Sequence, residues 1–544
     1  MEKSIMRSNI AHRFGAFTLL FLLLINATAF GGKPSVELRL LGSHTTGLFD
    51  KGAAEIVAHD PITQRLFVVS AFDSESVDPG IDVLDASDPS NPTFLFSIDL
   101  SDYGRAANSV DVKNGIVAAA VEANVKTDNG KVVFFDTNGN YLNDVPAGAL
   151  PDMLTFTPNG DCILVANEGE PSGYGAGFVD PIGSITIVDM RNGVANATAQ
   201  NVDFTQFNGT SIDPRIRIYG PGSSISQDLE PEYIAVDHNS KKAYVTLQEN
   251  NALAVLDIKS ATITKLVSLG FKDYSSGENK LDASDSSAGS PRIDIRNWPV
   301  FGMYQPDSIS TLKFKNRTFL VTANEGDARE YSSLVEEVRL GSSSYMLDPI
   351  IFPNAATLKL PANLGRLNVT NRTGDIDGDG DFDEIYTLGG RSFSIWTEDG
   401  ELVYDSGDDI EQRTAARYPL FFNASHTNNN LDSRSGNKGP EPEAVTIGKA
   451  YGRTYAFVGL ERIGGIMVYD VSDPYNVKYV QYINNRNFAV NPNSGTVNRT
   501  VGDLGPEGVK FISGDDSPTG VPLIAVANEI SGTTTLYEFV QVDN

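Results

Sequence analysis

The chain has 544 residues, of which 40% are hydrophobic and 21% charged, as in an ordinary globular protein with enough apolar material for a core. Its formal net charge of -28 disfavours binding to nucleic acid and to anionic membrane surfaces and favours cations and basic partners, although solubility alone is a sufficient reason for such a charge. The single cysteine, Cys162, excludes an intrachain disulfide.

Residues 1–30 have the features of a secretory signal peptide. Lys3 and Arg7 precede an apolar core from Phe17 to Ile25, and small residues follow it. This core is shorter than the roughly 20 residues that a membrane span needs, no second such run follows, and the C-terminal segment lacks the apolar tail of a lipid-anchor signal. We therefore expect a secreted, extracellular protein without a membrane span, in which residues 31–544 form one domain.

The stretch PDMLTFTPNGDCILVANEGE, residues 151–170, predicts two antiparallel strands joined by a tight Pro-Asn-Gly turn. Asp152 opens the first strand, and Glu168 follows the second. Because the start of the first strand and the end of the second are neighbours in a hairpin, we expect both carboxylates at the same end of this unit.

The same phrase recurs along the chain. Two weaker copies, AAEIVAHD and NSVDV, come first, and most copies are followed by a third strand that ends in Asp, such as SITIVDM. Further copies begin at Pro231, Pro306, Pro442 and Pro506. A β-meander that recurs at this scale indicates a propeller, a solenoid or an array.

The two ends of the chain favour a closed ring. The last repeat, residues 506–540, supplies only three strands, while residues 34–47 form a strand with no hairpin of their own. The N-terminal strand can complete the last unit, which removes the open sheet edges. The fold class is therefore all-β, a β-propeller of seven or eight four-stranded blades. Eight is the direct count if residues 350–410 form an irregular unit, and seven applies if that unit only extends its neighbour.

The long insertions and the recurring acidic residues fall on one face of this ring. Long loops that gather at one end of a rigid scaffold often carry function. We expect an acidic ring there, formed by the residues at the starts of first strands and the ends of second strands: Asp152, Asn167, Glu168, Glu232, Glu249, Asp307, Asn324, Glu325, Asp327, Glu443, Glu461, Glu507, Asn528 and Glu529.

Three interpretations of the acidic ring are open. Each acid can accept backbone N–H groups of its own blade, with Arg329 and Arg462 as ion-pair partners. Converging carboxylates can instead hold a cation, and carboxylate and amide oxygens are the ligands that Ca²⁺ prefers. Catalysis is the third interpretation.

A second acidic segment, DIDGDGDFDE, resembles a calcium-binding loop. Acids at positions 1, 3, 5, 7 and 9 with Gly at position 6 follow the logic of such loops, although position 12 is Tyr386 and no flanking helices are evident. We expect Ca²⁺ here, against the alternative of a solvated acidic turn. The candidate ligands are Asp375, Asp377, Asp379, Asp381, Asp383 and Glu384.

Asn-x-Ser/Thr sequons predict a glycoprotein if the source is eukaryotic. In the mature chain after the signal peptide they lie at Asn196, Asn208, Asn316, Asn368, Asn371, Asn423 and Asn498.

Catalytic motifs are otherwise lacking in the sequence. No His pair has zinc spacing, no Gly-x-Ser-x-Gly motif occurs, and no Gly-rich phosphate loop opens a helix. We therefore assign no catalytic residue. His426 is the one histidine that we would test, because it lies in a loop on the same face as the acidic ring.

The phrases ANEGE and ANEGD, together with NWPVFGMYQPDSIS, GDIDGDGDFDE, GGRSFSIW and GPEPEAV, resemble the secreted choice-of-anchor I family. The resemblance covers about residues 35–540. It implies an extracellular β-propeller glycoprotein and, in animals, a link to calcium-mineral deposition. Some family members are labelled alkaline-phosphatase-like, but no phosphatase metal or nucleophile motif matches residues of this chain.

The sequence thus predicts a secreted, acidic, calcium-binding propeller glycoprotein of an extracellular or mineralised matrix, with calcium or calcium mineral, matrix proteins or glycans as partners. A Ca²⁺-dependent phosphoesterase that uses the acidic ring is one alternative. A protein- or glycan-binding module is another, with aromatic contacts from Tyr174, Trp298, Tyr304 and Tyr331.

Overall fold

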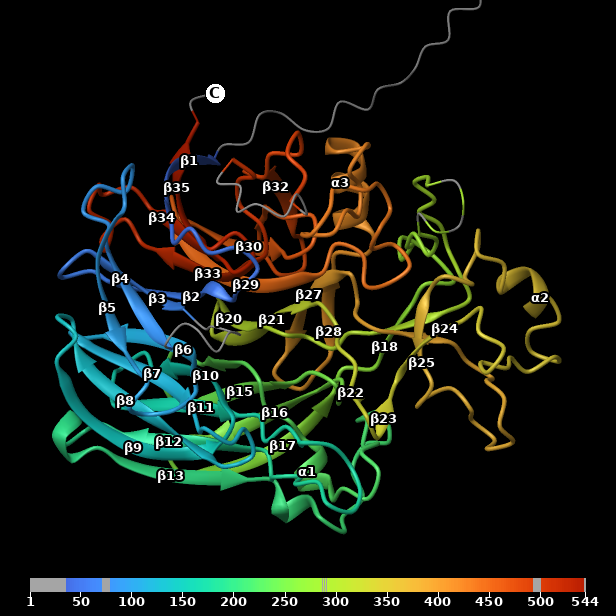
Figure 1. The fold of residues 1–544 in the computed structure, drawn as a ribbon, viewed down its shortest axis with the longest axis horizontal. Coiled ribbons are helices and arrows are strands. Elements are labelled where there is room, and N and C mark those ends of the chain that lie inside the picture. Colours follow the sequence, from blue (N-terminus) through green and yellow to red (C-terminus); the bar gives the residue numbers. More distant parts are fainter. Residues whose placement is uncertain are drawn as a thin grey trace, which may run out of the picture.

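The computed structural model describes residues 36–70, 79–285, 287, 289, 291–492 and 500–542. Seven four-stranded antiparallel sheets account for most of this part, and they surround a common centre (Figure 1). The expected all-β class is confirmed. The expected signal peptide and the sequon at Asn498 lie outside the described residues.

The first four sheets follow the chain in order, each built from consecutive strands. They consist of β2 (Ala53–Asp60), β3 (Arg65–Ser70), β4 (Gly80–Asp85) and β5 (Thr93–Asp99); β6 (Ala106–Lys113), β7 (Ile116–Glu122), β8 (Asn129–Asp136) and β9 (Tyr141–Ala149); β10 (Pro151–Phe156), β11 (Cys162–Asn167), β12 (Ser184–Asp189) and β13 (Thr198–Asp203); and β14 (Ile234–Val236), β15 (Lys242–Leu247), β16 (Ala252–Asp257) and β17 (Thr262–Ser268).

The last three sheets contain one interruption and one long-range pairing. They consist of β20 (Ile309–Phe314), β21 (Arg317–Asn324), β27 (Ser392–Thr397) and β28 (Leu402–Asp405); β29 (Pro442–Ala450), β30 (Arg453–Leu460), β31 (Ile466–Asp470) and β32 (Lys478–Ile483); and β33 (Pro506–Ile512), β34 (Leu523–Asn528), β35 (Thr533–Gln541) and β1 (Val36–Thr45).

β1 is the fourth strand of the last sheet. It pairs antiparallel with β35, from Val36 opposite Gln541 to Thr45 opposite Thr533. The first strands of neighbouring sheets also pack against one another around the centre, and β33 of the last sheet packs against β2 of the first.

The segment 350–410 does not form an eighth four-stranded sheet among the described residues. Its strands β27 and β28 instead complete the sheet that β20 and β21 begin, and β27 pairs with β21 from Ser392 opposite Asn324 to Thr397 opposite Phe319. The preceding strand β26 (Tyr386–Thr387) belongs to a small sheet with β18 (Phe271–Asp273) and β19 (Phe301–Met303).

Residues 271–303 and 326–391 together form a lateral module at the right of Figure 1. Its core contains Tyr274, Trp298, Tyr345 and Ile385, all buried. Its remaining elements are short: β22 (Glu330–Tyr331), β23 (Leu334–Val335), β24 (Glu337–Arg339), β25 (Asn368–Thr370) and α2 (Ala355–Leu358).

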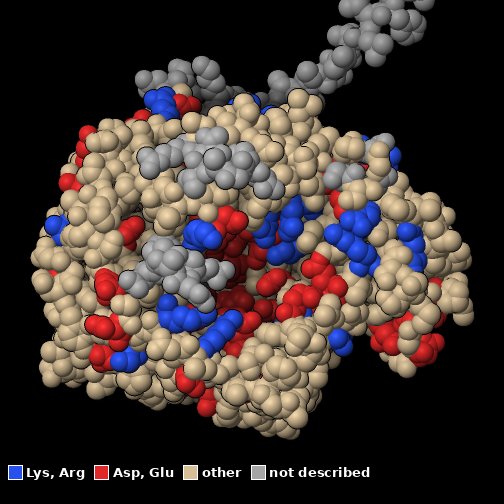
Figure 2. Space-filling model, in the orientation of Figure 1, with Lys and Arg blue, Asp and Glu red and all other residues tan. Residues whose placement is uncertain are grey.

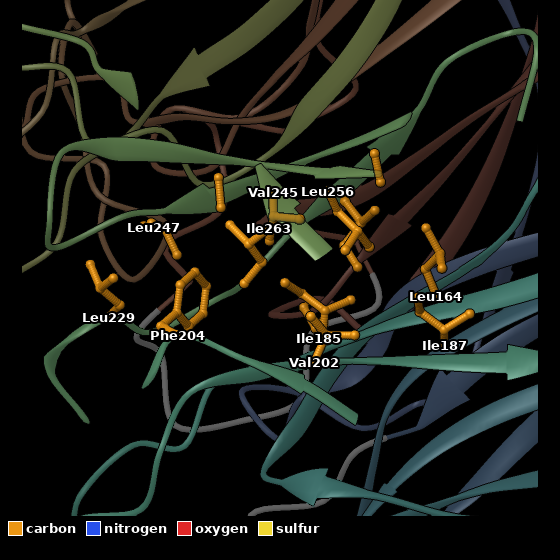
Figure 3. Packing of buried hydrophobic residues seen from close by; sticks show 14 of the residues in the cluster. Leu164, Ile185, Ile187, Val202, Phe204, Leu229, Val245, Leu247, Leu256 and Ile263 are labelled. Carbon is orange, nitrogen blue, oxygen red and sulfur yellow. The ribbon is translucent and has the colours of Figure 1, made fainter. Parts of the chain in front are cut away.

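The main cores lie between adjacent sheets. Leu164 and Ile185 of one sheet meet Val245 and Leu256 of the next, with Val202 beside them (Figure 3). Second and third strands are buried on both faces, and their sequences are therefore continuous runs of apolar residues. Each such side chain contributes about 1.5–3 kcal/mol on burial, which offsets the lack of disulfides.

Helices are few. Those in the described part of the chain are η1 (Val194–Asn196), η2 (Thr205–Phe207), α1 (Ile225–Asp228) and α3 (Asp409–Arg417), besides α2. In the described part of the chain, no helix combines the length and the apolarity that a membrane crossing requires.

Candidate functional site

The hairpin of β10 and β11 places two acidic side chains at one end. Pro151 pairs with Asn167, and the backbone N–H of Glu168 donates to the carbonyl oxygen of Leu150 over 2.9 Å. Asp152 and Glu168 therefore lie together and line one cavity. Their predicted proximity is confirmed.

All seven four-stranded sheets bring the start of their first strand to this same place. Figure 2 shows the result as a deep hollow with acidic side chains at its base and basic side chains around its rim, and we call it the acidic mouth. At the strand position that Asp152 occupies in its sheet, the seven sheets carry Glu55, Asn108, Asp152, Glu232, Asp307, Glu443 and Glu507. The ends of second strands add Glu168, Glu249, Glu325, Glu461 and Glu529.

Glu55 was not among the expected ring residues. The charges of Glu529 and Asp152 act on it, so it belongs to the mouth. The sequence feature that identifies Glu55 is the weaker repeat copy AAEIVAHD, in which Ala replaces the usual Pro before the acid.

Two groups of three carboxylates are close enough to share an ion. One oxygen from each of Glu168, Glu232 and Glu249 lies within 4.8 Å of the other two, and the same holds for Glu325, Glu443 and Glu461. Ca²⁺ lies 2.3–2.6 Å from its oxygen ligands, so one ion is able to contact all three oxygens of either group.

Several oxygens of these groups have no hydrogen-bond partner in the described part of the chain. They are Oε2 of Glu232, Oε2 of Glu249 and Oε2 of Glu443, each shielded from solvent. The whole Glu249 residue is only 6% exposed. A buried carboxylate oxygen without a donor is destabilising unless the group is protonated or a cation contacts it. The donor set and its unpartnered oxygens therefore fit a hard cation.

The pKa values of most carboxyl groups in the mouth are raised. Burial is the largest cause at each of them, followed for most of them by the charges of neighbouring acids. The pKa rises to about 6 for Asp152 and to about 7 for Glu325 and Glu529. It lies well above its usual range at Glu168, Glu232, Asp307, Glu443 and Glu507.

One side of the mouth is neutralised by cations. Lys438 Nζ lies 2.5 Å from Glu325 Oε1 and 3.3 Å from Glu441 Oε2, and Arg462 lies 2.6 Å from Glu461. Burial opposes ionisation of Glu461, but its hydrogen bond with His426 and the charge of Arg462 outweigh burial and lower its pKa. The expected ion-pair role of Arg462 is confirmed.

Arg329 takes a different place from the one expected. It pairs with Asp228 and, over 3.1 Å, with Glu230, which lie outside the predicted ring. Asp327, by contrast, is exposed at the rim, 4.0 Å from Lys438 Nζ.

The three asparagines expected in the ring are structural instead. The amide of Asn167 accepts from Gly148 N–H over 2.9 Å and donates to Thr186 Oγ1 over 2.9 Å. Asn324 donates to Ser394 Oγ over 2.7 Å, and Asn528 donates to the Thr533 carbonyl over 3.2 Å. Both amide atoms of Asn167 and Asn324 are hydrogen-bonded to residues of the sheets, so these two are not ligands facing the mouth, and Nδ2 of Asn528 likewise donates within its sheet.

The acidic loop lies on the lateral module, away from the mouth. Backbone N–H groups of Gly378 and Gly380 donate to Asp375, and that of Ile376 donates to Asp383 over 2.8 Å. These bonds fold the loop around its carboxylates, of which Asp375, Asp377 and Asp383 converge within 4.8 Å.

The remaining acids of the loop behave differently. Asp381 joins Asp383 and Asp348 in a second group within 4.8 Å. Asp348, which the sequence analysis missed, comes from a separate stretch of the module without a recognisable motif. Glu384 accepts from the Tyr386 hydroxyl over 2.5 Å instead, and Asp379 belongs to neither group.

The sequon asparagines divide by exposure. Asn196, Asn208 and Asn316 are exposed. Asn423 is fully buried and its Nδ2 donates to two side chains, and Asn368 is 6% exposed within β25. The fold leaves no room for a glycan at these two positions. Asn371 is half-buried, and its Nδ2 donates to the Val335 carbonyl.

His426 and the four aromatic residues are also placed. His426 Nδ1 lies 3.2 Å from Glu461 Oε1, and its ring forms a third potential ligand group with Glu461 and Glu529. Trp298, Tyr304 and Tyr174 are buried, and Tyr331 is half-buried with its hydroxyl donating to Glu170 Oε1 over 2.6 Å. The four therefore do not form the exposed aromatic surface that a glycan-binding module needs.

The sequence pattern of the choice-of-anchor I domain matches residues 55–474. The chain belongs to the choice-of-anchor I family. Its relatives include Gigasin-3a of Magallana gigas, 34% identical over 191 residues, which are 34% of this chain and 67% of that protein. The mesenchyme-specific cell surface glycoprotein of Strongylocentrotus purpuratus is 26% identical over 282 residues, which are 46% of this chain and only 36% of the relative's own length.

Solved structures that are similar to this chain include a β-propeller domain, at low sequence identity. The Cps50 (Swd1) β-propeller domain of Myceliophteria thermophila has a TM-score of 0.42 at 9% identity, covering 93% of this chain and 100% of that one. Kuenenia stuttgartiensis hydrazine synthase has a TM-score of 0.45 at 10% identity, covering 91% and 97%. These scores are too low to carry an argument about the site.

Proposed function

We propose that this protein is an extracellular propeller glycoprotein that binds Ca²⁺ in its acidic mouth. The observation that carries the proposal is the convergence of buried carboxylates whose Oε2 atoms, at Glu232, Glu249 and Glu443, have no partner among the described residues. Carboxylate oxygens alone form a hard ligand set, which suits Ca²⁺ better than zinc or copper.

The proposed scaffold is a closed propeller of seven blades. The seven four-stranded sheets, the pairing of β1 with β35 and the packing of β33 on β2 support closure. Closure matters for the site because it holds the acids of all seven sheets at fixed distances. A bound ion would relieve their mutual repulsion, so that ion binding and stability are linked.

The proposed location is outside the cell. One relative is by name a cell surface glycoprotein, residues 1–30 have the pattern of a secretory signal, and Asn196, Asn208 and Asn316 are exposed sequons. A role in a mineralised matrix follows from the same proposal, since an acidic calcium-binding surface suits contact with calcium mineral, matrix proteins or glycans.

A second candidate function is Ca²⁺-dependent phosphoester hydrolysis. The observation in its favour is that two groups of three carboxylates open to one mouth that also holds Lys438 and Arg462. Neighbouring metal ions are able to clamp a phosphate and activate water. Lys438 and Arg462 are already paired with Glu325 and Glu461, so these two side chains are less free to bind a phosphate. We therefore place this candidate second.

The test that separates the candidates is an assay for phosphate release from a simple aryl phosphate, run with Ca²⁺ and with EDTA on the same full-length sample. The binding proposal predicts calcium uptake without turnover. Turnover that needs Ca²⁺ and disappears in Glu325→Gln would establish the second candidate instead.

A further inference from the structure

A separate group of buried carboxylates lies where the lateral module meets α3 and the loop after it. Asp282 comes from the module, Glu411 from α3, and Asp432 from the loop at residues 418–441. Asp282 and Asp432 are completely buried, and Glu411 is 1% exposed. We call these three residues, together with Asn423, the Asp432 cluster.

The cluster carries more negative than positive charge. Arg391 Nη1 lies 2.9 Å from Glu411 Oε1 and balances that one carboxylate. The neighbouring Asp285 is separately neutralised by Arg366, at 2.9 Å. Asp282 and Asp432 remain without an ion-pair partner in the described part of the chain, and this leaves two negative charges when both are ionised.

Hydrogen bonds satisfy two of the three carboxylates. Asp282 accepts from the N–H of Asp294 over 2.5 Å and from that of Ser284 over 3.3 Å. Glu411 Oε2 accepts from the N–H of Asp282 over 3.2 Å. Ser435 and the backbone N–H of Arg292 lie close to Asp432 and favour its ionised form, but neither oxygen of Asp432 makes a well-formed hydrogen bond among the described residues.

An amide provides an independent sign of a missing partner. Asn423 is completely buried, and its Nδ2 donates to Glu411 Oε1 over 2.8 Å and to Ser435 Oγ over 2.9 Å. These bonds anchor the side chain within the cluster. Its Oδ1 nevertheless has no donor in the described part of the chain.

Protonation alone does not resolve this arrangement. A neutral Asp432 would still hold a hydroxyl and a carbonyl oxygen without partners in a buried site, and the Asn423 oxygen would remain unpaired, each of which is destabilising. A divalent cation would satisfy all of these oxygens and cancel the two excess charges.

We propose that Asp282, Asp432 and Asn423 Oδ1 bind a hard divalent cation of the Ca²⁺ class at a structural site distinct from the mouth and the acidic loop. Backbone carbonyl oxygens or water complete its coordination. Burial, and next the charge of Asp282, raise the pKa of Asp432 to about 8, while burial raises that of Asp282 to about 7. The ion therefore displaces protons when it binds at neutral pH.

The site would stabilise one wall of the mouth. Arg391 Nη2 donates to the carbonyl oxygens of Ser435 and Asn437 over 2.7 and 2.6 Å. Lys438, which contacts Glu325, follows directly in the chain. An ion at Asp432 thus holds the start of the segment that carries Lys438.

The test counts the ions bound by the full chain and records its melting temperature, in Ca²⁺ and in EDTA. Asp432→Asn keeps the shape of the side chain and should lose one bound ion per chain. In EDTA at neutral pH the variant should melt near wild type, because Asp432 with a pKa of about 8 is then largely uncharged, whereas in Ca²⁺ wild type should melt higher. Asp515→Asn, at an exposed position, is the matched control and should behave as wild type.

The same number of ions in Asp432→Asn and wild type would overturn the proposal. Crystals of wild type soaked in Mn²⁺ provide a second readout that needs no variant. An anomalous peak between Asp282 and Asp432 is expected, and its absence at full occupancy of other sites would also overturn the proposal.

Discussion

Glu443 and Glu507 act on one another electrostatically in the acidic mouth: after burial and the charge of Glu461, the charge of Glu507 raises the pKa of the Glu443 carboxyl above its usual range. These residues start the first strands of neighbouring sheets, β29 and β33. The pKa values of both carboxyls are raised well above the usual range, which favours their protonated forms in the metal-free mouth. A cation that binds there must compete with protons.

The metal-free protein should become less stable as the pH rises. Most mouth carboxyls, Glu461 excepted, have folded-state pKa values above their unfolded values. Their contribution is therefore complete below about pH 4 and is lost as the pH passes through about 6 for Asp152 and about 7 for Glu325 and Glu529. Melting in EDTA should therefore show a Tm that falls by several degrees between pH 5 and pH 8. Saturating Ca²⁺ should remove most of this fall. A Tm in EDTA that rises over the same range would contradict the described electrostatics.

Glu249→Gln should weaken calcium binding at the mouth. The change removes a charged ligand whose Oε2 is unpartnered among the described residues, and keeps the shape of the side chain. We expect the Kd to rise by at least about tenfold, or about 1.4 kcal/mol, in titration calorimetry. Glu122→Gln is the matched control, because Glu122 ends the second strand β7 but is paired with Arg105 at 2.7 Å. Equal losses in both variants would show that the effect is not specific to the ligand group.

The acidic loop should behave as an independent site. Asp377→Asn should remove one bound ion, since Asp377 belongs to the group with Asp375 and Asp383. Asp379→Asn, within the same loop but outside both groups, should retain the ion. Equilibrium dialysis with ion counting measures both, and affinity at the mouth should not change. An unchanged ion count in Asp377→Asn would indicate a solvated acidic turn.

The packing between sheets should dominate stability. Leu256→Ala leaves a cavity in the completely buried core of Figure 3 and should lower the free energy of unfolding by about 2–5 kcal/mol. Leu402→Ala, at a side chain that is 48% exposed on β28, should change it by less than about 0.5 kcal/mol. Urea denaturation in saturating Ca²⁺ measures both variants. Similar values for the two would contradict the inferred core.

Much of the mouth was predictable because a hairpin fixes where its ends lie. The repeat phrase put Asp152 beside Glu168, and strand geometry alone brings these two together. The asparagine assignments were wrong for a local reason: Asn167 and Asn324 lie beside Ser and Thr side chains of the next strand, which satisfy their amides. Sequence spacing does not reveal such cross-strand partners.

Other features depended on contacts between distant segments. The insertion of residues 326–391 of the lateral module between β21 and β27 hid the pairing that joins these strands, so the sequence suggested a separate unit. Asp348 and Asp432 occupy stretches without a motif, and only the fold brings them to Asp383 and Asp282. Ligand groups assembled in this way leave no pattern along the chain.

Calcium titration calorimetry on the full chain, stripped with EDTA and held at pH 7.5, tests the central claim most directly. The account predicts saturable binding, a binding heat that changes with the ionisation enthalpy of the buffer because protons are released, and loss of the mouth component in Glu249→Gln but not in Glu122→Gln. Absence of binding at millimolar Ca²⁺, or binding that Glu249→Gln leaves intact, would contradict it.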